Sequence, residues 1–262
     1  MGTFIFCTKY THKLMILDEI PTRPVCSDVG SQTNPIGKWV DIQLQPVAKT
    51  MSTFFKDSYA FKERVTGFRA PHGARSFSSD AIVIFPNITI HAAKSIIFPY
   101  LREKEKHFGH YDAATLIMAL IIVMDNNILR FGDLYFKQRS GTAMGKPPAP
   151  MWANIFEGLH ELKFLPRWKD STIFYLQFID NIYGIWAPTV DSTLERDNAS
   201  WDAFKANTND DHGLQWEFSE REMSTPFLDM NVRIQPDGEI KTILHEKPMA
   251  LYLFIPPGGW AE

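Results

Sequence analysis

The chain has few cysteines, no long apolar run and no signal-peptide pattern at its start. Cys7 and Cys26 are the only cysteines among 262 residues, which excludes a disulfide framework and favours a reducing compartment. The longest apolar run, 113–124, is shorter than the ~20 residues that a membrane-spanning helix needs, and we interpret it as a buried helix. We therefore expect an intracellular protein without a membrane partner.

An overall basic charge is also lacking. The formal net charge is −3 and the pI is about 6.2, so the chain shows no global basic footprint of the kind that many nucleic-acid-binding proteins have. Residues 1–78 carry ten Lys and Arg against six Asp and Glu, whereas residues 79–262 carry 17 against 24. This asymmetry suits an enzyme that holds an anionic polymer near a carboxylate–metal centre, but many ordinary domains share it.

Two apolar runs, 175–179 and 182–186, flank the polar pair Asp180-Asn181. Their β-branched and aromatic residues predict two strands, and the polar pair predicts the tight turn between them, since Asp and Asn tolerate left-handed backbone angles. Such a turn by itself indicates only a β-hairpin. A carboxylate at a rigid hairpin tip is also where a polymerase could hold a metal ion, so the rest of the chain decides between these readings.

The first third of the chain predicts strands, then helices, then a strand with a carboxylate at its start. Residues 4–27 read as two short strands joined by a loop, and the apolar spacing in 36–44 predicts an amphipathic helix. Residues 50–76 predict a helix followed by a loop. The continuous apolar run 81–85 predicts a buried strand that begins directly after Asp80.

The remaining two thirds interleave helices and strands, which predicts the α+β class. No internal repeat or low-complexity tract interrupts them. We expect helices at 90–104, 113–126, from the prolines at 147–150 to about 164, and within 190–211, and strands in a hairpin at 129–138, at 214–218, at 227–234 and at 240–244.

Two patterns are set aside. The segment Gly141 to Lys146 is similar to a phosphate-binding loop, but it has one residue too few between its glycines, and Pro147 stands where Ser or Thr should bind magnesium. His107 and His110 have the spacing of a metal-ligand pair without a second pair to complete a site, and we interpret them as surface residues.

Six short segments then follow one another in an order that is specific, although each alone is weak. They are Lys9-Tyr10-Thr11-His12-Lys13; Arg23-Pro24-Val25 with Gly30-Ser31; Asp80 through Phe85 to Asn87-Ile88; Gln138, Gly141-Thr142-Ala143-Met144-Gly145, Ala149-Pro150 and Ala153-Asn154-Ile155-Phe156; the Asp180 hairpin; and Phe227-Leu228-Asp229 with Lys247-Pro248. In this order they resemble the reverse transcriptases of Penelope-like retroelements over nearly the whole chain.

The resemblance implies a right-hand polymerase with fingers and palm, built on a central antiparallel sheet backed by helices. Residues 1–78 would be a fingers-like segment and residues 79–262 the palm, with part of 90–140 contributing to the fingers. The chain ends before a complete thumb, so we expect the thumb to be missing or truncated. The implied partners are an RNA template, a DNA primer and deoxynucleoside triphosphates.

The resemblance also implies a catalytic centre. Asp80 and Asp180 would bind Mg2+ (or Mn2+), and Asn181 stands where the family has a second hairpin aspartate. Nucleotide addition is an in-line phosphoryl displacement in which two divalent ions hold the attacking and leaving oxygens, and magnesium takes carboxylates together with substrate phosphates. The two aspartates must then lie on neighbouring strands.

Five further positions would bind the incoming nucleotide. Lys13 and Arg23 would contact its triphosphate, although taken alone they read equally well as a solvated strand edge. Phe85 falls where the family has an aromatic residue that crowds the sugar 2′ position and so favours deoxynucleotides. Gln138 and Gly141 would line the nucleotide and template site.

Two departures from the family pattern lower the expected activity. Asn181 keeps a carbonyl oxygen but removes one negative charge from a site for two dications, so metal affinity should fall. The family's Tyr-Thr is Phe85-Pro86 here, which removes a backbone donor in or beside the expected strand. The sequence therefore predicts a weakened or inactive polymerase. The alternatives are a catalytically silent retroelement-derived domain that at most binds nucleic acid, or an unrelated α+β domain.

Overall fold

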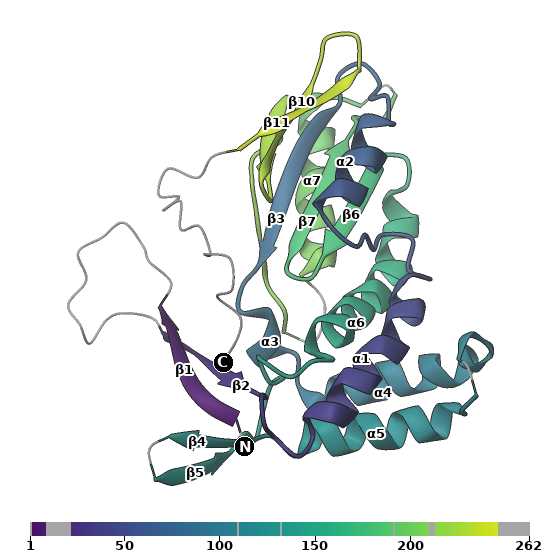
Figure 1. Cartoon of the computed structure of the whole chain (residues 1–262). Coiled ribbons are helices and arrows are strands. Elements are labelled where there is room, and N and C mark those ends of the chain that lie inside the picture. Colours follow the sequence, from purple (N-terminus) through teal and green to yellow (C-terminus); the bar gives the residue numbers. More distant parts are fainter. Residues whose placement is uncertain are drawn as a thin grey trace.

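Helices and strands are interleaved throughout the structure, a computed structural model, which confirms the α+β class (Figure 1). Its strands form three sheets within the part of the chain that is described. The described residues are 2–8, 22–108, 110–131, 133–190, 192–209 and 213–245.

The central sheet has the strand order β6-β7-β3-β8, and each neighbouring pair is antiparallel. β6 (Thr172–Phe178) and β7 (Asn181–Trp186) form the hairpin expected around Asp180. β3 (Arg75–Ala81) pairs with β7 along its length, and β8 (Trp216–Phe218) closes the edge.

Alternate side chains of β7 reach two separate hydrophobic cores, as the pleat of a strand requires. Trp186 lies in the core that includes residues of α6 (Ala149–Phe164) and α7 (Leu194–Thr208). Tyr183 lies in a second core with α2 (Ser58–Thr66), where its ring meets that of Phe61 edge-on at 5.2 Å. In Figure 1, α2 lies in front of the sheet and α7 behind it.

A small sheet extends the second core. Its strand order is β11-β10-β9, formed by β9 (Ser224–Phe227), β10 (Met230–Ile234) and β11 (Ile240–Leu244). Val232 and Phe227 are buried against α2 and the central hairpin.

A layer of helices contributes many residues to the core that contains Trp186. α1 (Asn34–Ala48) and α4 (Ile90–Glu103) each pack against both α5 (Ala113–Asp125) and α6, and in Figure 1 α1, α4 and α5 lie below the central sheet. The Thr89 side chain caps α4 by accepting a hydrogen bond from the backbone N–H of Ala92, as an N-cap residue does.

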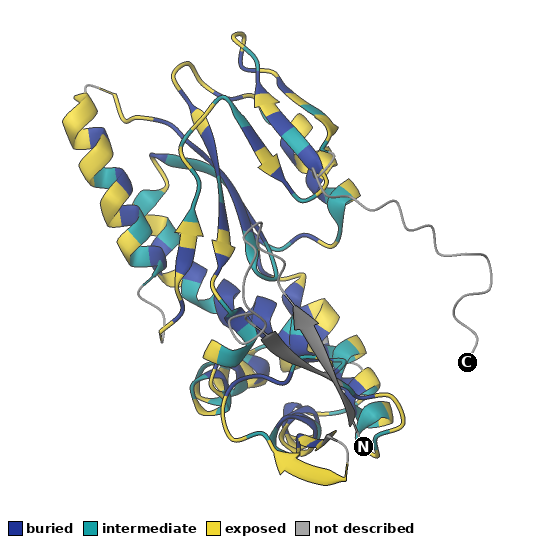
Figure 2. Ribbon diagram, turned by 90° about the vertical axis from the view of Figure 1, so that its left-hand side faces the viewer, coloured by how far each residue is buried: buried dark blue, intermediate teal, exposed yellow. Residues whose placement is uncertain are grey.

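The third sheet has the order β2-β1-β4-β5. β1 (Gly2–Thr8) and β2 (Thr22–Ser27) are antiparallel, which matches the two strands expected in 4–27. β4 (Ile128–Phe131) and β5 (Leu134–Lys137) form the hairpin expected at 129–138, and β4 lies parallel to β1. β5 is exposed along its whole length, in contrast to the buried strands of the central sheet (Figure 2).

The strand predicted at 81–85 is wrong. β3 ends at Ala81, so Asp80 lies near the end of a strand and not at its start. The apolar residues that follow enter a one-turn helix, α3 (Ile84–Asn87), through Val83, whose backbone is left-handed at φ +55°. Pro86 therefore lies within α3, in a first turn where a missing backbone N–H costs little, and not in or beside the strand.

Serine residues make β3 difficult to predict from the sequence. Ser76 and Ser79 are both buried, and such residues predict a loop more readily than a strand. Their hydroxyl groups are satisfied by backbone carbonyls across the sheet edge, at 3.0 Å to Glu222 and 3.0 Å to Glu217 respectively. The strand is thus stabilised by tertiary hydrogen bonds, which local sequence does not reveal.

The single strand predicted at 227–234 is also wrong. A tight turn at Leu228 and Asp229 divides it into β9 and β10, which pair with each other from Phe227 and Met230 onward. Leu228 has φ +53°, a left-handed conformation that is uncommon for a residue with an apolar side chain, so the sequence does not predict the turn.

The other predicted elements agree with the structure to within a few residues at their ends. α7 lies within the predicted segment 190–211, β8 lies within 214–218, and α6 begins among the prolines at 147–150. Two one-turn 3-10 helices, Glu105–His107 and Leu165–Trp168, follow α4 and α6. No helix in the described ranges is both long and apolar enough to span a membrane.

Candidate active site

The tip of the β6–β7 hairpin is one residue earlier than the sequence predicted. Ile179 and Asp180 form the turn, and Asn181 is already the first residue of β7, where it faces Phe178. Ile179 has φ +54°. A β-branched residue in this conformation costs on the order of 1–3 kcal/mol, so the surrounding structure must hold it in place.

Two buried amide side chains hold the turn. Asn154, from the middle of α6, accepts a hydrogen bond from the backbone N–H of Ile179 at 2.9 Å. Gln177 donates from Nε2 to the carbonyl oxygen of Ile179 at 3.2 Å, and its backbone N–H donates to the carbonyl oxygen of Thr53 at 2.9 Å. Asn154 belongs to the segment that resembles the polymerase helix motif, but its positioning role was not foreseen.

The end of β3 lies against this tip. Asp80 is the register partner of Asn181, and the backbone N–H of Ala81 donates to the carbonyl oxygen of Asp180 at 2.7 Å. The backbone of Asp80, near the end of β3, is therefore adjacent to that of Asp180 in the hairpin turn. Residues directly opposite on antiparallel strands present their side chains on the same face of the sheet.

The carboxylates of Asp80 and Asp180 both reach the surface. Asp80 is exposed and Asp180 is half-buried. Asn181 donates from Nδ2 to Oδ1 of Asp180 at 2.8 Å, which engages one oxygen of that carboxylate. The side-chain amide of Asn181 is thus turned toward Asp180 as a donor.

The oxygen donors at this point fit a magnesium ion that completes its coordination with substrate phosphates and water, because such sites use only one or two protein carboxylates. Within the described ranges, His, Cys, Asp and Glu side chains nowhere gather in a group of three or more that could hold a metal ion. A metal at Asp80 and Asp180 would therefore depend on ligands that the substrate supplies.

The loop that contains Gly141 and Thr142, called the glycine loop below, approaches the same end of the sheet. The backbone N–H of Thr142 donates to the carbonyl oxygen of Phe85 at 2.6 Å. Gly141 has φ +76°, and a Cβ added there would lie 2.6 Å from the carbonyl oxygen of Pro86. Only glycine allows this contact, so Phe85 and Gly141 are brought side by side.

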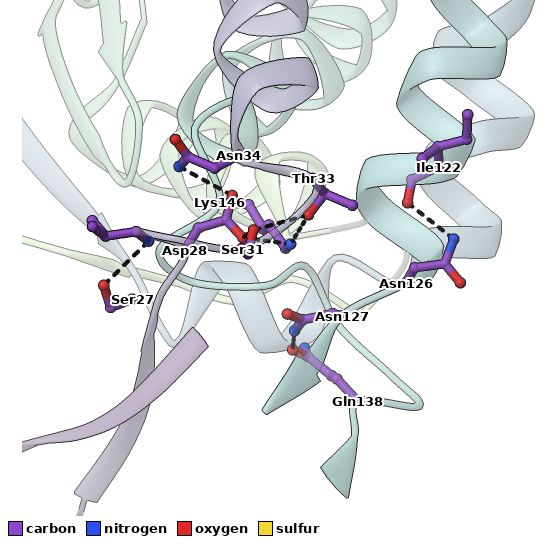
Figure 3. Close-up of polar contacts among 11 residues, drawn as sticks. Ser27, Asp28, Ser31, Thr33, Asn34, Ile122, Asn126, Asn127, Gln138 and Lys146 are labelled. Atoms are coloured by element: carbon purple, nitrogen blue, oxygen red, sulfur yellow. Dashed lines mark hydrogen bonds and ion pairs between the residues drawn. The ribbon is translucent and has the colours of Figure 1, made fainter. Parts of the chain in front are cut away.

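Gln138 forms the start of this loop and is fixed by its own side chain. It donates from Nε2 to the carbonyl oxygens of Ser140 at 2.8 Å and Gly141 at 3.2 Å. It also accepts a hydrogen bond from the Asn127 side chain, as Figure 3 shows. Gln138 is therefore held in one orientation.

Gln138 and Gly141 line a cavity of about 730 Å3. Its wall is rich in basic side chains, which the sequence reading did not single out: Lys94, Lys137 and Arg139 line it with His91, and Asp125 is its acidic member. Lys94 and Asp125 form an ion pair at 2.5 Å. The remaining positive charge favours an anionic ligand.

The two predicted triphosphate contacts are placed only in part. Arg23 lies on β2, where its backbone faces Cys7 of β1, and its side chain is outside the described part of the structure. Lys13 lies outside the described residues.

A buried ion pair holds the glycine loop to the start of α1 (Figure 3). Lys146 contacts Asp28 at 2.6 Å between Nζ and Oδ1, and it also donates to the Thr33 hydroxyl at 2.7 Å. Both charged side chains are almost fully buried. No local sequence pattern signals this pair, because its members are 118 residues apart in the chain.

No protein-family profile matches the chain, and no curated protein matches it either. Solved structures do. An apo telomerase from Candida tropicalis, truncated from its C-terminal domain, has a TM-score of 0.62 at 11% identity over 93% of this chain and 54% of its own. A Candida albicans telomerase in complex with a TWJ fragment of telomeric RNA has a TM-score of 0.65 at 9% identity, over 92% and 46%.

A viral enzyme shows the same likeness. The BmCPV RNA-dependent RNA polymerase in its elongation state has a TM-score of 0.61 at 11% identity, over 88% of this chain and 21% of its own. The chain thus spans about half the length of the telomerase chains and a fifth of the viral polymerase. At these identities the likeness concerns the fold, and the fold of this chain is that of a reverse-transcriptase-like nucleic-acid polymerase.

Proposed function

We propose that this chain is the fingers and palm of a reverse transcriptase of the Penelope-like group, an RNA-directed DNA polymerase. One observation carries the proposal: Asp80, near the end of β3, is in register with the hairpin whose tip holds Asp180, within a polymerase fold. Its substrates would be deoxynucleoside triphosphates, and its partners an RNA template and a DNA primer.

In this proposal Asp80 and Asp180 hold Mg2+ or Mn2+. Bound there, the divalent ion would stabilise the charge that develops as the primer 3′ oxygen attacks the incoming phosphate. The protein's own part is to position its groups in advance. Asn154 and Gln177 fix the strained turn at Ile179, so the Asp180 carboxylate is held at the tip before any ligand arrives.

The nucleotide would lie beside Phe85, where α3 meets the loop that contains Gly141. Phe85 would crowd the sugar 2′ position, and the neighbouring Gly141 leaves the loop backbone close to it. Gln138, fixed by its hydrogen bonds, would face the nucleotide or template from the basic cavity. Arg23 and Lys13 would contact the triphosphate.

A division of the chain follows from the same proposal. Residues 1–78 would be the fingers-like segment and 79–262 the palm, with part of 90–140 joining the fingers. β3 crosses this division, so the end of the first segment contributes to the central sheet that carries the candidate site.

A silent nucleic-acid-binding domain is the second candidate, and the Asn181 hydrogen bond favours it. That bond engages one Asp180 oxygen, and the site has one negative charge fewer than a second aspartate would give. The basic wall of the 730 Å3 cavity, at Lys94, Lys137 and Arg139, would remain available for phosphate contacts. Binding of this kind weakens steeply as salt rises.

Primer extension on an RNA template with Mg2+ or Mn2+ tests both candidates. We expect weak incorporation by the unmodified chain, none by Asp80→Ala, and more by Asn181→Asp because the added carboxylate strengthens metal binding. Binding of Mn2+, followed by electron paramagnetic resonance, should change in the same order.

Asp202→Ala is the matched control, since Asp202 is an exposed carboxylate on α7. It should leave both readouts unchanged. If all four proteins are folded and none extends a primer or binds Mn2+, the polymerase proposal fails, and salt-sensitive RNA binding would then support the silent domain.

A further inference from the structure

The support of the strained turn at Ile179 extends beyond Asn154 and Gln177. β6 is an edge strand of the central sheet as described, so the outer backbone groups of β6 need partners from outside this sheet. Near the turn, the segment between α1 and α2 supplies them. The backbone N–H of Gln177 donates to the carbonyl oxygen of Thr53 at 2.9 Å, and Phe54 forms a parallel bridge with Gln177. Thr53 therefore holds a residue that holds the turn.

A buried carboxyl group fastens Thr53 from its other side. The Thr53 hydroxyl donates a hydrogen bond to Oε2 of Glu161, and both side chains are buried. The hydroxyl of Tyr175 lies against the same carboxyl group. Tyr175 comes two residues before Gln177 on β6, and such residues share one face of a strand. Glu161 thus joins the segment after α1 to the strand that leads into the turn.

Both lines of support begin on one face of α6. Asn154 and Glu161 are seven residues apart on this helix, which is close to two turns, or about 10 Å along its axis. Asn154 accepts the backbone N–H of Ile179 directly at 2.9 Å. Glu161 acts through Thr53 and Gln177, and Gln177 donates to the carbonyl oxygen of Ile179 at 3.2 Å. α6 therefore holds the two backbone polar groups of Ile179 by two separate routes.

We infer that Thr53 and Glu161 are positioning residues for the carboxylate of Asp180. Ile179 keeps its left-handed conformation only while its surroundings hold it, and Asp180 is the next residue of the same turn. A ligand group that is already in place binds a metal ion without a further cost of ordering. The inference rests on the proposed function, in which Asp180 holds a divalent ion, and it adds two residues that contact neither metal nor substrate.

Amide hydrogen exchange tests this support without any activity. Thr53→Val removes the hydroxyl at nearly the same size, and the backbone amides of Gln177 and Ile179 should then exchange about fivefold faster, the equivalent of one ordinary hydrogen bond. Thr53→Ser keeps the hydroxyl and should restore the wild-type rates. Thr208→Val is the matched control, because Thr208 is also buried and its hydroxyl makes one hydrogen bond, to the carbonyl oxygen of Phe204 within α7. It should leave the exchange of both amides unchanged.

A double variant tests whether the two residues act through one hydrogen bond. Glu161→Met removes the acceptor and places an apolar side chain in the core. The amide of Ile179 should exchange faster in this variant, and adding Thr53→Val should accelerate it no further. Additive increases would mean that Thr53 and Glu161 act separately, and would contradict the inference.

Metal binding gives the functional readout. Binding of Mn2+, followed by electron paramagnetic resonance, should be severalfold weaker in Thr53→Val and unchanged in Thr53→Ser and Thr208→Val. Primer extension by Thr53→Val should show a lower kcat with an unchanged KM for the nucleotide, since the proposed nucleotide contacts lie elsewhere. A purely structural role would lower only the fraction of folded protein, and the folded fraction would bind Mn2+ with wild-type affinity.

The inference is overturned if Thr53→Val leaves the exchange of Gln177 and Ile179 as slow as in Thr208→Val, or if Thr53→Val binds Mn2+ as tightly as the wild-type chain does. Glu161→Met provides the same comparison if Thr53→Val does not fold. Absence of Mn2+ binding by the wild-type chain would instead be a failure of the proposed function. The exchange of Ile179 would then still decide whether Thr53 and Glu161 hold the turn.

Discussion

At the scale of single residues, Glu161 is a carboxylic acid that the fold keeps largely out of water. It is 2% exposed, and burial raises its pKa to about 7. In the unfolded chain the same group titrates near its ordinary value of 4.5. The native state therefore holds this proton more tightly than the unfolded state does, and Glu161 contributes a pH dependence to folding stability.

We predict that the free energy of unfolding falls as pH rises from about 4.5 to about 7. Between these values the native state binds more protons than the unfolded state, so raising the pH favours unfolding, by on the order of 3 kcal/mol in total. Urea denaturation at several pH values measures it. Glu161→Gln should flatten this part of the profile, and an unchanged slope in that variant would show that another group is responsible.

At the scale of elements, the loop before α6 is shaped by one close contact. Gly141 has φ +76° and lies against the backbone of Pro86. The position therefore needs a residue that adopts a left-handed conformation and has no Cβ. The contact fastens the loop to α3, and through α3 to the end of β3, where Asp80 lies. The placement of Phe85 beside the loop depends on the same contact.

We predict that Gly141→Ala destabilises the chain more than Gly73→Ala does. Gly73 has a similar φ of +82° with nothing near an added Cβ, so its substitution costs about 1 kcal/mol of backbone strain alone. Gly141→Ala adds a clash with backbone atoms that must move, and we expect at least about 2 kcal/mol. Urea denaturation of the two variants gives the comparison. Equal costs would mean that the loop shifts freely away from α3.

At the scale of the whole molecule, one buried ion pair joins two distant parts of the chain. Asp28 follows β2 at the turn into α1, and Lys146 precedes α6, 118 residues later. Asp28 also accepts hydrogen bonds from the side chains of Ser31 and Asn34, so donors in the turn before α1 stabilise its charge as well. Both ends of the pair must be present for either charge to remain buried.

We predict that Lys146→Met lowers the free energy of unfolding by about 3–5 kcal/mol, because it leaves the Asp28 carboxylate buried and uncompensated. The double variant Asp28→Asn with Lys146→Met should lose less than Lys146→Met alone, since it removes that charge. Denaturant titration measures both.

Lys241→Met provides the control, because Lys241 and Glu239 form an exposed pair whose loss should cost under about 1 kcal/mol. A cost for Lys146→Met as small as that of the control would mean that Asp28 is hydrated in the folded protein.

The sequence by itself determined most of the elements and the order of the segments. Periodic apolar spacing placed α1, a continuous apolar run placed α5, and prolines placed the start of α6. Turn residues placed the hairpins around Asp133 and Asp237. These signals are local, so they do not need knowledge of distant partners. By themselves they indicated the α+β class, whereas the resemblance of six ordered segments to reverse transcriptases indicated the polymerase fold that the solved structures support.

Only the tertiary structure decided the elements whose backbone is held from elsewhere. β3 is rich in serine, and it forms a strand because the serine hydroxyl groups donate hydrogen bonds to backbone carbonyls across the sheet. Val83, Ile179 and Leu228 adopt positive φ angles, which their apolar side chains do not predict. The buried pair of Asp28 and Lys146 likewise joins residues that share no local pattern. In each case the stabilising partner comes from another part of the chain, and such a partner exists only once the chain has folded.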